Sequence, residues 1–375
     1  MSTDPSAEVF ARAPLVRFSV YSHIQAEYLR ATSAEILSVL DKMFKGGNAV
    51  GGHEFNRAYG LFWLWVLGAY EVTRTMSQYK AGFSKRAAVE IQTFKKQIEK
   101  VRIPFAKLEF PSKWNEPIAI DGEASVAGFD FELRDLLFEI KGNKHTARSL
   151  IDGFDKMLGS IQSDDVLCDL RQVNRWQTLW SKLGKPRYDG AAWYRRLLAA
   201  YNEPQRHYHN WQHLEECLGE LAQYWNLAKR PALVAAAVWF HDAVYDPKSA
   251  TNEEDSAALA VECLGGAGVA ERDVAAVRAL ILCTKTHETA GVPDAALLLD
   301  IDLAILGQPG ERFWEYEVAI RQEYAWVPEE TFCTKRAEIL RKFLVRPVIY
   351  QTPAFRTRYE TTARANLKAA IERLI

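Results

Sequence analysis

The chain has 375 residues, which suggests about two domains of ordinary size. Hydrophobic residues make up 48% and charged residues 25%, so a disordered chain, a collagen-like chain and a small disulfide scaffold are excluded. The 47 Lys and Arg residues against 48 Asp and Glu residues give a net charge of −1, so the chain carries no strong nucleic-acid signal.

The five cysteines are widely spaced and form no CxxC pair. This pattern predicts reduced thiols of a cytoplasmic protein and argues against a structural zinc site built on them. The first ten residues, MSTDPSAEVF, lack the basic and apolar regions of a signal peptide. The most apolar run, Leu61–Ala69, is too short to span a bilayer. We therefore expect no membrane partner.

The first part of the chain, residues 1–165, is expected to form a mostly α-helical domain with a small β-hairpin element. The predicted elements are helices from about Ser22 to a glycine-rich loop at Gly46–Gly52, from Glu54 to Tyr79 and from Ser84 to Val101, then strands within Phe105–Phe110 and Ile118–Phe131. The polar segment Ser160–Asp169 is the expected boundary. A sensing or partner-binding module is one interpretation of this part.

The second part, residues 170–375, shows an almost entirely helical pattern, so the fold class is mainly α with an all-α bundle at the C-terminus. The predicted helices are Tyr188–Tyr201, Asn210–Ala228, Pro231–Val244, Asn252–Leu264, Glu271–Thr286, Asp294–Leu306, Arg312–Tyr324, Glu329–Leu344 and Pro353–Leu374. Helical bundles hold metal ions through side chains that project inward from several helices.

Five of the eight histidines fall between residues 207 and 287. His209 and His213 are four residues apart, so on a helix they lie one turn apart on the same face. Asn210 suits the N-cap of that helix. The alternative is a pair of partly exposed surface histidines.

An adjacent His241-Asp242 pair follows the apolar run Leu233–Val238. A carboxylate at the end of a buried helix needs a metal ion or a strong partner, because its desolvation is costly. Asp300 and Asp302 interrupt another apolar helix and point in directions about 200° apart. Only one of the two should face the same cavity.

Two further groups are weaker candidates. His287 follows a predicted helix, where the helix dipole alone would favour a cation. Thr251 and Glu254 have the spacing of a capping box, which leaves Asn252 and Glu253 as candidates near the site.

The ordered residues His213, His241-Asp242 and Asp302 resemble the H…HD…D pattern of the HD superfamily of metal-dependent phosphohydrolases, over roughly residues 173–375. The chain looks most like a group of small bacterial predicted HD phosphohydrolases. The supporting strings are RHYHNWQH, WFHDAVYD, NEEDSA, TKTH, LDIDLAILG, IRQEY and ARANL. The resemblance implies an HD-type helical bundle in which these four residues bind metal, with His287 near a second ion.

The YHN–H string is also similar to the catalytic start of cyclic-nucleotide phosphodiesterases. That similarity implies that His209 is the general acid, and that Asp302 is the ligand in preference to Asp300. The chain lacks the long regulatory and specificity segments of those enzymes.

Two His and two Asp ligands suit Mn, Fe, Zn, Ni or Co and tolerate Mg, as one ion or two, with Asp242 able to bridge a pair. A metal-bound hydroxide would attack phosphorus while His209 protonates the leaving oxygen. The candidate phosphate-binding cations, each of which could equally be a solvated surface charge, are Arg206, Lys285 and Arg321. The other candidate substrate-binding residues are Tyr208, Asn252, Glu253 and Tyr324.

The expected function is metal-dependent hydrolysis of a phosphate ester or anhydride bond in a nucleotide or another small phosphorylated metabolite. The alternatives are a cyclic nucleotide or dinucleotide phosphodiesterase and a non-heme di-iron oxidase on the same scaffold. A homo-oligomer is compatible with the sequence.

Overall fold

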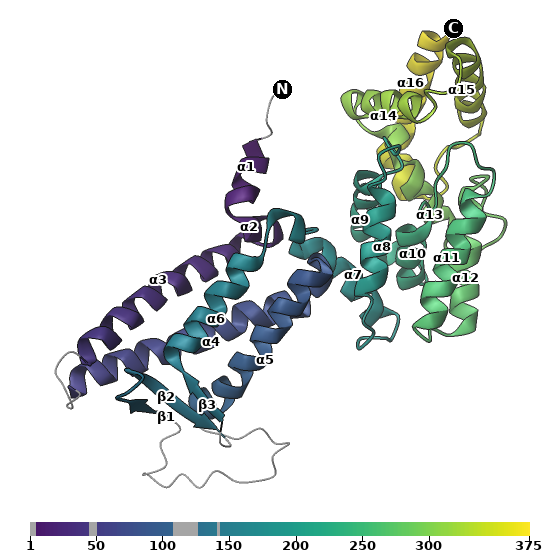
Figure 1. The fold of residues 1–375 in the computed structure, drawn as a ribbon. Helices are drawn as coiled ribbons and strands as arrows, with labels where there is room; N and C mark the ends of the chain where they lie inside the picture. Colours follow the sequence, from purple (N-terminus) through teal and green to yellow (C-terminus); the bar gives the residue numbers. More distant parts are fainter. Residues whose placement is uncertain (1–4, 45–50, 108–126, 141–142) are drawn as a thin grey trace. The chain divides into compact units, whose positions relative to one another are not determined.

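The computed structural model describes residues 5–44, 51–107, 127–140 and 143–375, and it confirms a mainly α fold (Figure 1). The chain divides into two compact units, Met1–Arg175 and Trp176–Ile375, so the division falls inside helix α7 (Leu170–Lys182). Within the described ranges, no helix is long and apolar enough to cross a membrane.

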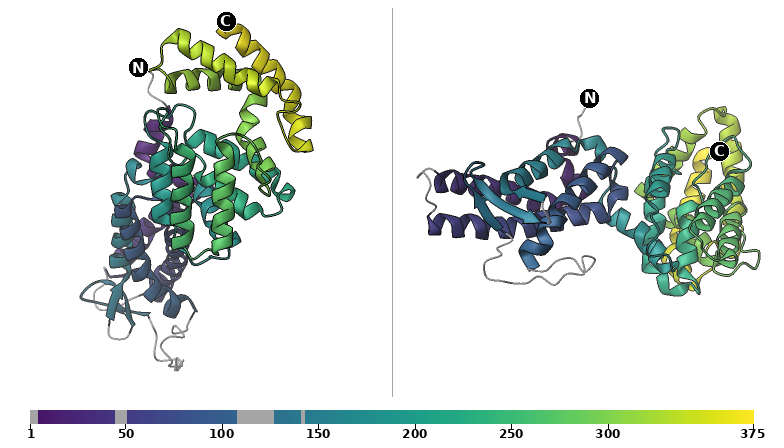
Figure 2. Two further views of the ribbon diagram at one scale, coloured as in Figure 1. Left: turned by 90° about the vertical axis from the view of Figure 1, so that its right-hand side faces the viewer. Right: turned by 60° about the horizontal axis from the view of Figure 1, so that its bottom comes forward.

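Long helices form the core of the first unit. They are α3 (Val20–Met43), α4 (Gly52–Gln78) and α5 (Lys85–Lys107), preceded by α1 (Pro5–Arg12) and α2 (Pro14–Phe18) and followed by α6 (Ala147–Ser160). Helix α4 packs against both α3 and α5, and the right view of Figure 2 shows these long helices, coloured purple to blue, running along the first unit. Apolar residues at helical spacing, such as Ile36 and Leu40 of α3, are fully buried there.

The apolar run Leu61–Ala69 is a core segment of α4. Trp65 is 1% exposed, and its indole N–H donates to Ser33 Oγ at 2.8 Å. Its ring stacks on Phe62 with centroids 5.5 Å apart. The neighbouring Trp63 is 37% exposed on the outer face of the same helix.

The small sheet begins inside the second predicted strand range, Ile118–Phe131, and continues into two strands that the sequence did not predict. Strands β1 (Ala127–Asp130), β2 (Asp135–Ile140) and β3 (Asn143–Thr146) are antiparallel in the order β1-β2-β3, with Phe138 opposite both Ala127 and His145. The strand predicted at Phe105–Phe110 is wrong for residues 105–107, which continue α5. A short run of alternating apolar and polar residues fits both the helix and the strand periodicity. Adding residues to an existing helix costs less free energy than forming a new element. Residues 108–110 and 118–126 lie outside the described residues.

The segment Ser160–Asp169 packs against the start of α5. Asp165 is buried and accepts hydrogen bonds from Ser84 Oγ and the Arg86 guanidinium, and Ser84 N donates to the Asp165 carbonyl at 2.8 Å. This polar segment is therefore tethered to the first unit.

The second unit is an all-α bundle. Its helices are α8 (Ala191–Tyr201), α9 (Trp211–Gln223), α10 (Pro231–Phe240), α11 (Asn252–Gly266), α12 (Glu271–Thr284), α13 (Ala295–Asp302), α14 (Gly310–Glu323), α15 (Glu329–Leu344) and α16 (Pro353–Leu374). Helix α10 is central, because every residue from Leu233 to Phe240 is buried.

Two helix ends differ from the predicted ones in ways that shape the site. Helix α10 ends at Phe240, so His241 is its C-cap and Asp242 lies beyond it. Helix α13 ends at Asp302, and Leu303–Gly307 form a 3₁₀ helix. The motif residues therefore stand at the ends of helices.

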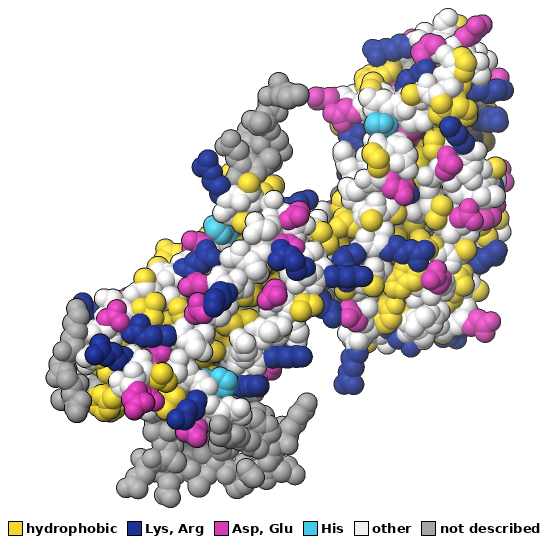
Figure 3. All heavy atoms as spheres, in the orientation of Figure 1, with side chains coloured by type: hydrophobic (Ala, Val, Ile, Leu, Met, Phe, Trp, Pro, Cys, Tyr) yellow, Lys and Arg dark blue, Asp and Glu magenta, His cyan; other side chains and the backbone are white. Residues whose placement is uncertain are grey.

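Acidic and basic side chains are intermingled on the face of the molecule in Figure 3. That distribution agrees with the near-zero net charge of the chain.

Candidate metal centre

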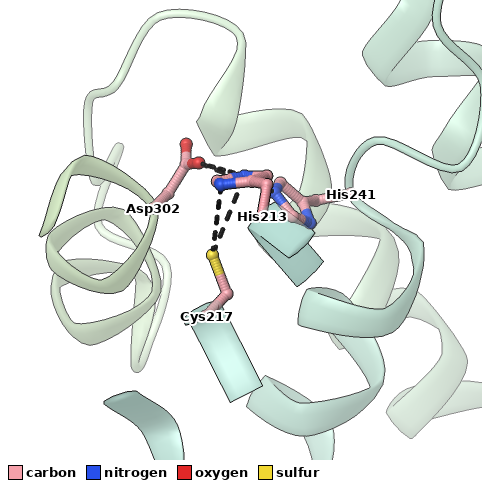
Figure 4. Close-up of side chains that lie close together, drawn as sticks. All are labelled: His213, Cys217, His241 and Asp302. Atoms are coloured by element: carbon pink, nitrogen blue, oxygen red, sulfur yellow. Dashed lines mark hydrogen bonds and ion pairs between the residues drawn. The ribbon is translucent and has the colours of Figure 1, made fainter. Parts of the chain in front are cut away.

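Three segments of the second unit bring their polar side chains to one buried point (Figure 4). Asn210 caps α9 and accepts from the backbone N–H groups of Gln212 and His213, which places His213 in the first turn. His241 follows α10, and Asp302 ends α13. His213 and His241 are each 2% exposed.

The ligand atoms of this cluster are close to one another. The Nε2 atoms of His213 and His241 are 3.1 Å apart. Asp242 Oδ2 lies 3.4 Å from His213 Nε2 and 3.1 Å from His241 Nε2. Asp302 Oδ1 lies 3.3 Å and 3.5 Å from the same two nitrogens. Metal bonds of roughly 2.0–2.2 Å place neighbouring ligand atoms roughly 3.0–3.5 Å apart, so the spacing fits one ion.

The chemistry of His241 supports the same conclusion. Its Nδ1 lies 2.9 Å from the Val238 carbonyl oxygen, which can only accept, so Nδ1 carries the proton. Nε2 of the same ring faces His213 Nε2 and two carboxylates, and in the neutral ring it offers a lone pair to a metal ion. Lone pairs and carboxylates repel one another unless a cation lies among them. The residues present fit a divalent metal ion.

Cys217 is a further member of the cluster, and the sequence analysis gave it no role. One ligand atom from each of His213, Cys217, His241 and Asp302 lies within 4.8 Å of the others. However, Cys217 Sγ is 3.7 Å from Nε2 and 3.8 Å from Nδ1 of His213, so it faces the side of that ring between the two nitrogens. Asp242 Oδ2 is closer to His213 Nε2 than Cys217 Sγ is and lies 3.1 Å from His241 Nε2, which makes it the better fourth ligand.

The electrostatics of the cluster match its geometry. Burial opposes the charge of Asp242, yet His241 and His213 hold the pKa of its carboxyl well below the usual range. Burial likewise opposes the charge of Asp302, whose pKa is held low by His213, His241 and His287. Positive charge on the histidines therefore stabilises both carboxylates, and a metal ion would do the same.

The two aspartates of α13 have separate roles. Asp300 is 1% exposed and accepts from the backbone N–H groups of Gln351 at 2.6 Å and Thr352 at 2.7 Å. Burial raises the pKa of Asp300 to about 6 in spite of these donors. Asp302 faces the cluster, and its second oxygen lies 3.3 Å from His287 Nε2. Asp300 thus anchors the chain before α16.

His209 lies beside the cluster and is held by Glu323, which the sequence analysis missed. Glu323 Oε2 lies 2.7 Å from His209 Nδ1 and accepts from the Tyr245 hydroxyl at 2.8 Å. Glu323 Oε1 accepts from the backbone N–H groups of His207, Tyr208 and His209. The His209 ring stacks on Tyr245 at 4.2 Å and its centroid is 6.1 Å from that of His213.

Arg206 is a structural cation in this geometry. It is 5% exposed, and its guanidinium donates to the backbone carbonyls of His209, Asp242 and Ala243 and to Glu203 Oε2. It joins the segment before α9 to the segment after α10. The structure therefore places Arg206 behind the cluster, as a support for His209 and Asp242.

The other two candidate phosphate-binding cations are engaged elsewhere. Lys285 donates to the Ala250 carbonyl at 2.7 Å and to Glu254 at 2.6 Å. Arg321 donates to Glu329 and to the carbonyls of Tyr324 and Val327. Neither side chain lines the cavity described next.

A cavity of about 510 Å³ adjoins the cluster. Roughly 300–1,000 Å³ is the usual size of a small-molecule site. The predicted site residues that line it are Tyr208, His209, Asp242, Asn252, Glu253, His287, Asp302 and Tyr324. Lys335 and Arg336 of α15, which the sequence analysis did not select, line it as well.

Tyr208 lies between the cluster and the cavity. Its ring centroid is 4.7 Å from that of His213 and 4.5 Å from that of Tyr316. Its hydroxyl is buried and has no hydrogen-bond partner among the described residues. That hydroxyl can donate to a group bound beside the cluster.

Comparisons of this chain with protein-family models, with curated proteins and with solved structures find no match. The case for a metal centre therefore depends on the residues themselves.

The two aspartates of α13 should separate metal binding from stability. Asp302→Ala should lose bound metal and keep the fold, because it removes one ligand. Asp300→Ala should keep bound metal and lower the unfolding free energy by about 2 kcal/mol or more, because it leaves two buried N–H donors unpaired. Elemental analysis and urea denaturation measure the two effects. If Asp300→Ala lost its metal and Asp302→Ala retained it, Asp300 would be the metal ligand and Asp302 the structural residue.

Glu323 should make stability depend on acidity. Burial opposes its charge, but His209 and the backbone donors lower the pKa of Glu323 to about 2. Because the folded pKa is below the unfolded value, the stabilisation is full above about pH 4.5 and is lost as the pH falls towards 2. Glu323→Gln should therefore cost about 3 kcal/mol of unfolding free energy at pH 7 and about 1 kcal/mol less at pH 3.5. An equal cost at both values, measured by urea unfolding, would contradict this account.

Proposed function

We propose that the second unit is a metal-dependent phosphohydrolase that cleaves a phosphate ester or anhydride bond in a small phosphorylated metabolite. One observation carries the proposal. The Nε2 atoms of His213 and His241 lie 3.1 Å from each other, and each lies 3.1–3.5 Å from an oxygen of Asp242 and of Asp302, although the four residues come from three separate segments. The resemblance of these residues and their surrounding strings to the HD superfamily supports the same reaction class.

These four side chains would hold the ion. Two imidazoles and two carboxylates suit Mn, Fe, Zn, Ni or Co and tolerate Mg. When bound, a divalent ion supplies a water of lowered pKa and stabilises negative charge on phosphoryl oxygens. His287 contacts the second oxygen of Asp302 and lines the cavity. It would therefore be a ligand of a second ion.

His209 would supply the proton to the leaving oxygen. Its Nδ1 faces the Glu323 carboxylate, which orients the ring. The ring lines the cavity and stacks on Tyr245, so its orientation is set on two sides. Arg206 holds the backbone of His209 and Asp242 together, which keeps the proton donor next to the cluster.

Removal of one imidazole should abolish activity. His241→Ala should lose bound metal and metal-dependent phosphate release from a panel of phosphorylated metabolites that includes linear and cyclic nucleotides. His207→Ala is the matched control, because this exposed histidine lies outside the cluster and offers Glu323 only its backbone N–H. Elemental analysis and a phosphate or nucleoside assay measure both properties. Full activity in His241→Ala would mean that the site is misassigned.

If His209 is the general acid, the loss of kcat on its removal should depend on the leaving group of the substrate. His209→Ala should lower kcat about 10²–10⁴-fold for an ester with a poor leaving group, such as an alkyl phosphate. The loss should be much smaller for 4-nitrophenyl phosphate, whose leaving oxygen needs no proton. Metal content should stay unchanged. Equal losses for both substrates would assign His209 a role other than proton donation.

A further inference from the structure

The cavity beside the cluster has two chemically different sides. One side carries His209, Asp242, His287 and Asp302. The opposite side is built by α14 and α15 and by the turn between them, and it is mainly apolar. Its members on α14 are Tyr316 and Ile320, followed by the C-cap residue Tyr324, and their spacing of four residues places them on one helix face.

Helix α15 contributes a continuous stripe to this wall. Phe332, Arg336, Ile339 and Phe343 follow one another at spacings of four, three and four residues, which is the spacing of one helix face. The stripe spans about 16 Å. At its far end the Phe343 ring meets His287 with centroids 5.6 Å apart, so this stripe of three apolar side chains and Arg336 reaches the cluster.

Apolar side chains at this wall are exposed to solvent. Ile339 is 44% exposed and Trp326 is 54% exposed, and both line the cavity. Single exposed apolar residues are ordinary, but here they continue a buried apolar wall formed by Ile320, Phe332 and Leu340. A ligand that covers them would remove apolar surface from water.

The polar groups of the same wall have partners of their own. The Arg336 guanidinium donates to the Tyr316 hydroxyl at 2.7 Å and pairs with Glu317. Lys335 pairs with Glu338 at 3.0 Å on the surface. A polar heterocycle placed against this wall would leave its edge atoms facing Ile320, Ile339 and Leu340, which cannot form hydrogen bonds. An apolar group has no such cost.

We infer that the substrate is a phosphate monoester of an alcohol with an extended apolar group, which lies along the α14–α15 wall while its phosphate lies at the cluster. This inference rests on the proposed hydrolysis at that cluster. In the reaction the phosphorus–oxygen ester bond breaks, water supplies the oxygen that replaces it, and the leaving oxygen takes a proton. The products are inorganic phosphate and the free alcohol.

Binding and turnover can be tested separately on the full chain loaded with metal. Methyl-, butyl- and octylphosphonate cannot be hydrolysed at the carbon–phosphorus bond and serve as binding probes. Calorimetry should give a dissociation constant that falls about fourfold for each added methylene, the factor expected when about 0.8 kcal/mol is gained per buried methylene. The heat-capacity change on binding should become more negative along the series.

A pair of variants identifies the wall. Ile339→Ser should weaken octylphosphonate binding several-fold and leave methylphosphonate binding unchanged. Val318→Ser is the matched control, because Val318 is an exposed α14 residue that does not line the cavity. Metal content should be the same in both variants.

The outcomes separate this inference from the proposed function. Affinity that does not change with chain length, or tighter binding of a nucleoside monophosphate than of octylphosphonate, would overturn the apolar substrate class whatever the activity. Chain-length-dependent binding without phosphate release from octyl phosphate would support the apolar site and contradict the hydrolase. Release of phosphate at rates that rise with chain length would support both.

Discussion

The second unit depends on one electrostatic constraint: two carboxylates and two imidazole nitrogens share a buried volume in which they repel one another without a cation. Asp242 and Asp302 stay ionised there because the histidines carry compensating positive charge or hold a metal ion. Every residue of helix α10 from Leu233 to Phe240 is buried, and His241 follows as its C-cap, so the helix places His241 at that volume. A polar centre in an apolar bundle is stable only when its charges are matched, and here the match requires segments from three helices to arrive together.

Two buried charges outside the cluster keep those segments in place. Arg206 offers its donors to backbone carbonyls that follow α10, where a helix end leaves acceptors unpaired. Glu323 does the converse, since one carboxylate oxygen accepts from three successive N–H groups before α9. Arg206 thus binds backbone carbonyl acceptors that follow α10, and Glu323 binds backbone N–H donors that precede α9. The loops that carry His209 and Asp242 are held together because their backbone polar groups have charged partners.

The parts of this site that sequence reasoning could predict are local in the chain. The spacing of His209 and His213, the cap at Asn210 and the His241-Asp242 pair after an apolar run are visible within a few residues. Glu323 acts on residues 114 to 116 positions away, and although the IRQEY string contains it, nothing in that string shows which backbone groups it binds. The same limit explains Lys285 and Arg321, because a sequence shows the charge of a side chain and not the carboxylate that it pairs with. In the first unit, β1 falls inside a predicted strand range, but the end of α5 was not predictable from a short alternating run, which fits a helix and a strand equally well.

The two sides of the cavity therefore differ in how the sequence encodes them. The side that carries the His and Asp cluster is a set of short motifs, and the proposed reaction class rests on those motifs. The α14–α15 wall is an amphipathic pattern with the spacing of any core-facing helix, and Phe332, Ile339 and Phe343 would look the same if they packed against another helix. Only their position in space, beside His287 and the cluster, makes them part of a binding surface. In the proposed function, reaction class and substrate class therefore reside in different elements of this bundle, and a change in the wall would alter which ester binds while the proposed metal ligands stay the same.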